Sequence, residues 1–275
     1  MQALPLNKTS GKTSTKSDDL WETILTEARS EAEKEPALAS FINATILAHS
    51  TLENALSFHL ANKLGTPTLS ALETRDIIDE AIHTYHCVGD AARCDLLAIR
   101  DRDSACDDLM SPFLFFKGFH ALQAYRVANC LYKRGRRTLA LYFQSQIAAI
   151  FGVDIHPAAT IGKGILLDHA TGIVIGETAI VEDDVSIMQS VTLGGTGKNA
   201  GDRHPKVRRG VLLSAGAKVL GNIEIGEGAK VGAGSVVLRS VAPHTTVVGV
   251  PSHVVGATNS EVPAHNMDHR IDSHS

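Results

Sequence analysis

The fold is decided by residues 153–193, which read VDIHPAATIGKGILLDHATGIVIGETAIVEDDVSIMQSVTL. Small aliphatic residues return here every six positions, and the interval resumes at 207–237 after a break at 194–206. The thirteen positions are Ile155, Ile161, Leu167, Ile173, Ala179, Val185, Val191, Val207, Leu213, Val219, Ile225, Val231 and Val237. A period of six suits neither an α-helix nor an alternating strand. It is typical of a parallel β-helix, in which each short strand buries one aliphatic side chain along the axis.

The distribution of rings and glycines agrees with this interpretation. All 13 aromatic residues lie between Trp21 and Phe151, whereas 18 of the 23 glycines lie at Gly152 or later. A narrow prism has no room for rings, and its corners favour residues without a Cβ atom. Two architectures therefore meet near Phe151, and 194–206 is expected to be the one loop that breaks the repeat.

The first half has helical spacing. Leu20, Trp21, Ile24, Leu25 and Ala28 share one helix face, and further helices are predicted at 36–64, 70–87, 91–101, 118–134 and 137–150. The predicted fold class is α + β, an N-terminal α-helical domain followed by a left-handed parallel β-helix of hexapeptide repeats with one extruded loop. We expect a disordered extension at 1–16, the helical domain at 17–151, the β-helix at 152–257 and a flexible C-terminal tail at 258–275.

Composition excludes several classes of protein. A formal net charge of −4 argues against non-specific binding of nucleic acid. No apolar run approaches the roughly 18 residues of a membrane-spanning helix, and the N-terminus lacks an apolar signal segment. Four cysteines are too few for a disulfide scaffold. We therefore expect a cytoplasmic protein.

Polar residues interrupt the aliphatic pattern in three clusters. These are Asp154-Ile155-His156-Pro157, Asp168-His169-Ala170-Thr171-Gly172 and Asp202-Arg203-His204-Pro205. A histidine beside a carboxylate can accept a proton from a hydroxyl near neutral pH, so His169 is a candidate base with Asp154 or Asp168 as its partner. The planar fork of Arg203 suits a carboxylate, and an aspartate suits an ammonium group. Together these charges predict an amino-acid pocket, although a solvated ion-pair loop fits the sequence equally well.

Several segments resemble the serine O-acetyltransferase family. In the second half they are DIHPAA at 154–159, LDHATG at 167–172, SVTLGGTGK at 190–198 and GDRHPK at 201–206. In the helical half they are LASF at 38–41, LANKL at 60–64 and KGFHALQAYR at 117–126. The resemblance covers roughly residues 20–257. It is specific, because acyltransferases of other substrate classes share the β-helix but not this N-terminal domain.

The resemblance implies transfer of the acetyl group of acetyl-CoA to the hydroxyl of L-serine, giving O-acetyl-L-serine, the precursor of cysteine. His169 would be the general base, oriented by Asp154, and attack on the thioester would be direct, with no resident cofactor or metal. The positions that match the family's serine-holding residues are Asp103, Asp168, Arg203 and His204. The candidates for contacts with acetyl-CoA are Gly194, Gly195, Thr196, Gly197, Lys198, Lys218 and Lys230, the glycine loop through its backbone N–H groups and the lysines through the CoA phosphates.

The resemblance also implies an assembly. The family forms trimers through the β-helix, with active sites between neighbouring prisms, and pairs two trimers through the helical domains. Feedback inhibition by L-cysteine is expected in the serine pocket. Many members end in an isoleucine that inserts into O-acetylserine sulfhydrylase, whereas this chain ends at Asp272-Ser273-His274-Ser275, which argues against that partner.

Two alternatives stay open on the sequence alone. One is a zinc enzyme of the carbonic anhydrase type on the same β-helix, with His156, His169 and His204 as ligands. The other is a solenoid scaffold that binds the sulfhydrylase without catalysis. The remaining histidines of the second half are interpreted as solvated side chains, namely His244, His253, His265, His269 and His274.

Overall fold

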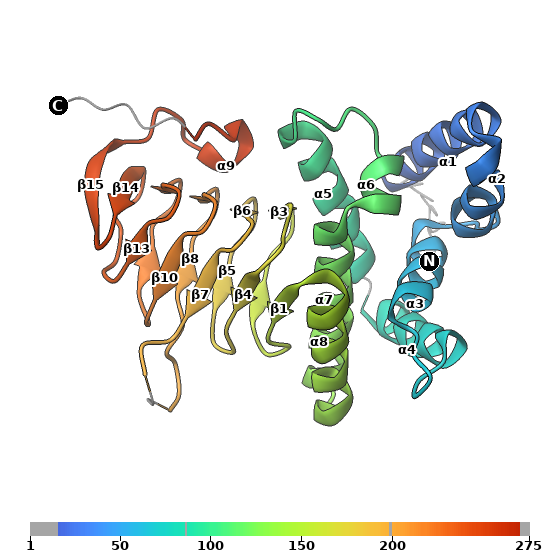
Figure 1. Cartoon of the computed structure of the whole chain (residues 1–275), viewed down its shortest axis with the longest axis horizontal. Helices are drawn as coiled ribbons and strands as arrows, with labels where there is room; N and C mark the ends of the chain where they lie inside the picture. The colour runs from blue at the N-terminus through green and yellow to red at the C-terminus, as the bar shows by residue number, and fades with distance from the viewer. Residues whose placement is uncertain (1–15, 86, 198–199, 270–275) are drawn as a thin grey trace, which may run out of the picture.

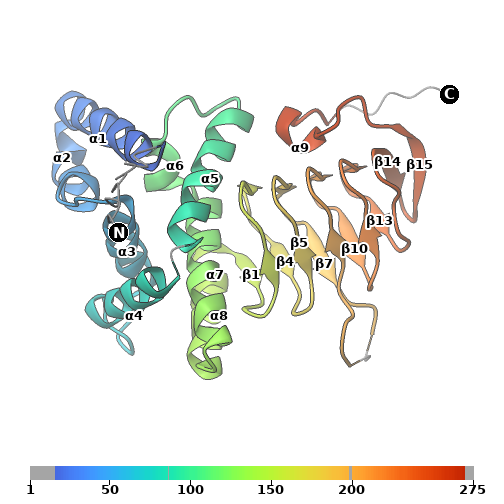
Figure 2. The same ribbon diagram turned by 180° about the vertical axis from the view of Figure 1, so that it is seen from behind.

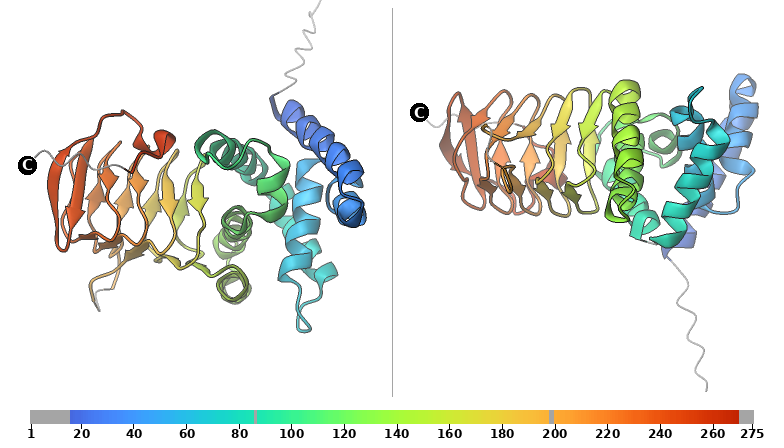
Figure 3. Two further views of the ribbon diagram at one scale, coloured as in Figure 1. Left: turned by 45° about the horizontal axis from the view of Figure 1, so that its top comes forward. Right: turned by 90° about the horizontal axis from the view of Figure 1, so that it is seen from below.

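The computed structural model describes residues 16–85, 87–197 and 200–269. Figure 1 and the reverse view in Figure 2 show a block of helices beside a prism of short strands, and in Figure 3 the strands stack as successive coils away from the helices. The predicted α + β fold, helices followed by a left-handed parallel β-helix, is confirmed. Of the extension expected at 1–16, residues 1–15 lie outside the described residues.

The helical part contains eight α-helices and one π-helical turn within the described residues. They are α1 (Lys16–Lys34), α2 (Pro36–Ile42), η1 (Asn43–Leu47), α3 (Leu52–Leu64), α4 (Ala71–Thr84), α5 (Cys87–Arg102), α6 (Met110–Phe115), α7 (Lys117–Lys133) and α8 (Arg137–Phe151). The single pattern predicted at 36–64 is broken, because the Thr51 hydroxyl accepts a hydrogen bond from the Asn54 N–H and starts a new helix. Helix α6 was not predicted. No helix among the described residues is long and apolar enough to cross a bilayer.

The prism is built from three stacks of short strands. The strands are β1 (Val153–Ile155), β2 (Thr160–Ile161), β3 (Leu166–Asp168), β4 (Ile173–Ile175), β5 (Ile180–Val181), β6 (Ser186–Met188), β7 (Thr192–Gly194), β8 (Lys206–Val207), β9 (Leu212–Leu213), β10 (Lys218–Leu220), β11 (Glu224–Ile225), β12 (Lys230–Val231), β13 (Val236–Val237), β14 (Thr245–Gly249) and β15 (Ser252–Ala257). The sheet orders are β1-β4-β7-β10-β13, β11-β8-β5-β2 and β15-β14-β12-β9-β6-β3. Pairing is parallel except for the closing hairpin of β14 and β15.

Strand register corrects the predicted repeat. Ile155 pairs with Ile175, twenty residues on, whereas Ile175 and Leu193 are eighteen apart, as are Val219 and Val237. Leu193 and Val219 are twenty-six apart. The regular coil therefore has eighteen residues, the third carries eight more in the extruded loop, and the first carries two more after β3. The expectation that 194–206 is the only break is wrong.

The error has a simple cause. Twelve of the thirteen predicted positions are buried and Ile161 is half-buried, so the repeat identified inward residues correctly. In β4, however, both Ile173 and Ile175 are buried and only Val174 between them faces outward. A shift of two residues leaves the inward pattern unchanged, because side chains two apart on a strand share a face.

The first coil rests directly on the helices. Helix α8 ends at Phe151, and Gly152, with a φ of +67°, carries the chain into β1. Helix α7 begins so close to β3 that a Cβ atom on Gly118 would lie 2.1 Å from the carbonyl oxygen of Leu167. Buried Asp95 joins the two parts, since it accepts from the Arg126 guanidinium at 2.7 Å and from the Ile165 N–H at 2.9 Å.

The chain returns along the prism after β15 instead of ending in the flexible tail expected from residue 258. Helix α9 (Pro263–Asn266) lies beside the coils, with Ala264 fully buried (Figure 1). The Ala264 carbonyl accepts from the Ser186 hydroxyl at 2.8 Å, and its N–H donates to the Gly210 carbonyl at 3.2 Å. These bonds, one to β6 and one to the turn before β9, hold the segment against the prism. The tail beyond residue 269 lies outside the described residues.

Candidate active site

The two extra residues of the first coil form the corner that carries His169. His169 and Ala170 have φ values of 53° and 61°, in the left-handed region that costs non-glycine residues on the order of 1–3 kcal/mol. The corner projects the imidazole, whose side chain is 72% exposed, with its Nε2 3.7 Å from Asp168 Oδ1. Strained residues of this kind gather at functional sites.

His169 opens into a cavity of about 670 Å³ between the prism and the helices. Two carboxylates, Asp103 and Asp168, share it with the imidazole. Burial raises the pKa of Asp168, and the like charge of Asp103 adds to this, while a charged His169 opposes it. Arg102 and Lys117 also line the cavity, so its two carboxylates and one exposed imidazole suit a ligand that has a cationic group and a reacting proton without being cationic overall.

Asp154 is not hydrogen-bonded to His169 within the described chain. Its Oδ1 accepts from Gln144 Nε2 of α8 at 2.7 Å, on the outer face of β1. A single chain therefore gives the candidate base Asp168 as its carboxylate neighbour, whereas the family resemblance implies Asp154 in that role.

Arg203 and His204 lie at a different corner of the prism. Arg203 Nη2 is 2.7 Å from Glu177 Oε2, and His204 Nδ1 is 2.9 Å from Thr178 Oγ1. A Cβ atom on Gly176 would lie 2.0 Å from the His204 ring, so this packing requires glycine. Burial, and then the charge of Arg203, lowers the pKa of His204.

The strand order shows why these residues do not meet His169. His169 follows β3, at the edge between the third and first sheets, whereas Gly176 follows β4, at the edge between the first and second sheets. The predicted substrate residues thus form two groups on one chain, Asp103 with Asp168 and Arg203 with His204. His156 follows β1, at the edge between the first and second sheets that also carries His204, so the three candidate zinc ligands do not converge on His169. The described residues contain no group of three metal-binding side chains.

The candidates for acetyl-CoA lie along the extruded loop and the adjoining faces. Gly194 ends β7, and Gly195, Thr196 and Gly197 follow it in the loop. Lys218 donates to the Ser190 carbonyl, and Lys230 is only 7% exposed. Lys198 lies outside the described residues.

Several residues of the cavity were missed at the sequence level, among them Lys117, Met267 and His269. Lys117 donates to Thr171 Oγ1 in the His169 corner and lines the cavity; its only sequence signal was its place at the start of KGFHALQAYR. Met267 and His269 come from the segment after α9. His269, interpreted from sequence as solvated, bonds through Nδ1 to Ser214 Oγ at 2.9 Å, and no spacing signal could have shown it.

The fold and the polar corners define the class of bacterial hexapeptide transferases. Residues 204–239 match the family model described as bacterial transferase hexapeptide (six repeats), and residues 20–124 match serine acetyltransferase, N-terminal. A serine acetyltransferase of Salmonella typhimurium is 57% identical over 249 residues, 90% of this chain and 91% of the relative. The chain belongs to the serine acetyltransferase family and is an acyltransferase.

Solved structures of relatives hold ligands of this chemistry. A serine acetyltransferase in complex with cysteine has a TM-score of 0.91 at 52% identity and covers 93% of this chain and 99% of its own. The Brucella abortus enzyme with coenzyme A has a TM-score of 0.87 at 49% identity, covering 89% and 98%. The soybean enzyme with serine has a TM-score of 0.86 at 55% identity, covering 88% and 100%.

Proposed function

We propose that the chain transfers the acetyl group of acetyl-CoA to the hydroxyl of L-serine, giving O-acetyl-L-serine and CoA. The observation that carries this proposal is the exposed His169 imidazole at the mouth of a cavity that also holds Asp103 and Asp168. The carboxylates suit the ammonium group of an amino acid, and the imidazole is available to its hydroxyl. Relatives bind serine, cysteine and coenzyme A, which matches this chemistry.

In the proposed mechanism His169 accepts the hydroxyl proton as the serine oxygen attacks the thioester carbonyl. The tetrahedral intermediate carries a negative oxygen, which the backbone N–H groups of the Gly194–Gly197 loop would stabilise. Collapse breaks the carbon–sulfur bond, and the imidazolium returns its proton to the departing CoA thiolate. No acyl-enzyme is required, in keeping with the absence of cysteine after residue 130.

We further propose that each site is completed by a neighbouring chain in a trimer. The guanidinium of Arg203, suited to the serine carboxylate, lies on a different prism edge from His169 and supports this arrangement. Asp154 on the first face would then approach the base from the neighbouring prism, or through rearrangement of its bond to Gln144. Pairing of two trimers through the helices is supported by Phe41 and Phe115, which are 37% and 52% exposed and stack with centroids 6.3 Å apart.

L-cysteine is proposed as a feedback inhibitor of the same pocket. It shares the ammonium and carboxylate of L-serine and differs only in its thiol, so the residues that hold serine would hold it too. We place the reaction in the cytoplasm and in cysteine biosynthesis.

The function is tested by the release of CoA thiol from acetyl-CoA across a panel of hydroxyl-bearing amino acids. Release is expected only with L-serine, or far faster with it than with homoserine or threonine. His169→Ala should lower kcat by about 100- to 10,000-fold, the usual contribution of a general base. His253→Ala, on the exposed hairpin, is the matched control. Near-normal turnover in His169→Ala would exclude His169 as the base.

A further inference from the structure

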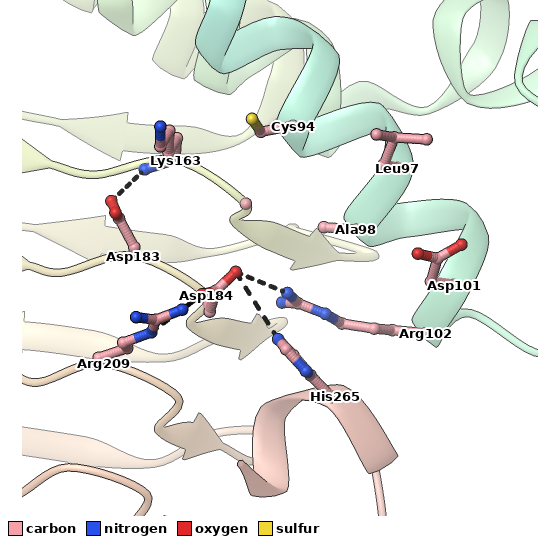
Figure 4. A pocket seen from close by; sticks show the side chains of 11 residues that line it. Cys94, Leu97, Ala98, Asp101, Arg102, Lys163, Asp183, Asp184, Arg209 and His265 are labelled. Atoms are coloured by element: carbon pink, nitrogen blue, oxygen red, sulfur yellow. Dashed lines mark hydrogen bonds and ion pairs between the residues drawn. The ribbon is translucent and has the colours of Figure 1, made fainter. Parts of the chain in front are cut away.

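One carboxylate anchors the C-terminal segment to the rest of the site. Arg102 Nη2 of α5 is 3.4 Å and His265 Nε2 of α9 is 3.6 Å from Asp184 Oδ1, and Arg209 Nη2 is 2.7 Å from Oδ2 (Figure 4). The Arg102 side chain is only 4% exposed. We call Arg102, Asp184, Arg209 and His265 the Asp184 cluster. It joins α5, the prism and α9, three segments far apart in sequence.

The Asp184 cluster holds two walls of the His169 cavity. Arg102 directly precedes Asp103, and His265 lies four residues before His269; both Asp103 and His269 line the cavity. The segment after α9 is therefore fixed beside the proposed serine site by the Asp184 cluster, of whose four members only Arg102 also lines the cavity. The Ser214 hydroxyl then fixes the His269 ring within this segment.

His269 and Asp168 are close enough to affect each other's charge. The charge of Asp168 raises the pKa of His269 and a charged His269 lowers the pKa of Asp168, although burial, followed by Lys230, lowers the pKa of His269 overall. The charged groups that face His269 are Asp168 on β3, Lys230 on β12 and Asp268 on its own segment. The other charged groups of the cavity are Arg102, Asp103, Lys117 and His169.

We propose that His269 is a positioning residue of the serine site, whose neutral ring leaves Asp168 free to pair with the ammonium group of the amino acid. This inference rests on the proposed function. When His269 takes up a proton, its ring becomes a cation near Asp168. This cation competes with the ammonium group of the substrate for the same carboxylate. Serine binding should therefore weaken as His269 becomes charged.

The test is equilibrium dialysis of labelled L-serine against the full-length chain in a His169→Ala background, which removes the titration of the candidate base. Because burial lowers the pKa of His269 below its usual value of 6.5, the ring becomes charged only in the acidic range. Between about pH 7 and pH 5 we therefore expect the Kd for L-serine to rise by up to about tenfold, the effect of about one pKa unit of coupling. With His269→Gln added, the change should fall below about twofold. Ser214→Ala, which frees the ring, should reduce the pH dependence, and His253→Gln should leave it intact.

The outcomes separate the two proposals. If L-serine binds and its pH dependence survives His269→Gln, the role of His269 is refuted while the proposed function stands. If His269→Gln weakens binding equally at both pH values, the residue acts through packing alone, and the inference is again refuted. If no variant binds L-serine although each melts like the parent chain, the proposed function itself fails, and the inference with it.

Discussion

Mixing two inactive variants tests whether the proposed site is built from two chains. His169→Ala removes the candidate base at one prism edge, and Arg203→Ala removes the candidate carboxylate ligand at another. His169→Ala alone should have about 1% of the normal kcat/KM or less, since the base contributes at least about 100-fold. Arg203→Ala alone should have about 3% or less, since a charged contact is worth about 2–5 kcal/mol.

The activity expected to return in the mixture depends on how many sites combine two undamaged edges. In a trimer assembled at random from equal amounts, a site is intact when one chain carries a native His169 and its neighbour a native Arg203. Each condition holds for about half of the chains, so about a quarter of the sites should be intact. Co-expression with two affinity tags would isolate the mixed trimers, in which one site of three is intact, so about a third of normal activity is expected in that fraction. CoA release with L-serine would measure the recovery.

A mixture without recovery, from trimers shown to contain both variants, would refute the two-chain site. The control is a mixture of His169→Ala with Asp168→Ala, two changes at the same edge. Here every site has at least one damaged residue at that edge, so no recovery is expected. Recovery in this control would mean that the assignment of residues to edges is wrong.

Three further predictions follow from packing and charge. Asp184→Asn should lower the free energy of unfolding, measured by urea denaturation, by about 2–4 kcal/mol, because it leaves the buried Arg102 without its charge partner. The control Asp101→Asn, at an exposed ion pair, should lower it by less than about 1 kcal/mol. Gly118→Ala should lower the free energy of unfolding by at least about 1–3 kcal/mol, because the new methyl group meets the Leu167 carbonyl. The methyl group of Gly234→Ala meets open space, so this control adds only backbone strain. A larger loss of stability for Gly234→Ala would contradict the packing argument. Burial raises the pKa of Asp168 above its unfolded value, so the contribution of this group to stability falls as pH rises through the interval between the folded and unfolded pKa values. Asp168→Asn should therefore stabilise the unliganded protein at pH 7, on the order of 1 kcal/mol by thermal unfolding. The same change should weaken L-serine binding.

The sequence predicted the parts of the fold that depend on local pattern. The six-residue interval identified the inward positions from Ile155 to Val237, because each reports burial in a narrow core regardless of its neighbours. It missed the two-residue shift after Leu167, because Ile173 and Ile175 both face inward. It also joined 36–64 into one helix, since nothing in the apolar spacing reveals the new start capped by Thr51.

The site was predictable only in its residue types. His169, Asp168 and Arg203 were identified as chemically suited to an amino acid, and the resemblance added Asp103. Their separation onto different edges depends on how many residues each corner contains, which strand register reveals and residue type does not. His269 could not be found at all, because its place depends on contacts made by α9 some fifty residues away from Ser214.

The return of α9 makes the length of the prism a fixed quantity. The hairpin of β14 and β15 reverses the chain at the far end, and α9 then reaches Ser186 and Gly210 midway along the coils. One additional eighteen-residue coil would move the hairpin about 4.8 Å outward and draw α9 away from those anchors by a similar amount. The repeat therefore cannot be extended freely, as in an open solenoid, unless the linker at 258–262 grows with it. The contacts of α9 therefore set the number of coils in the prism.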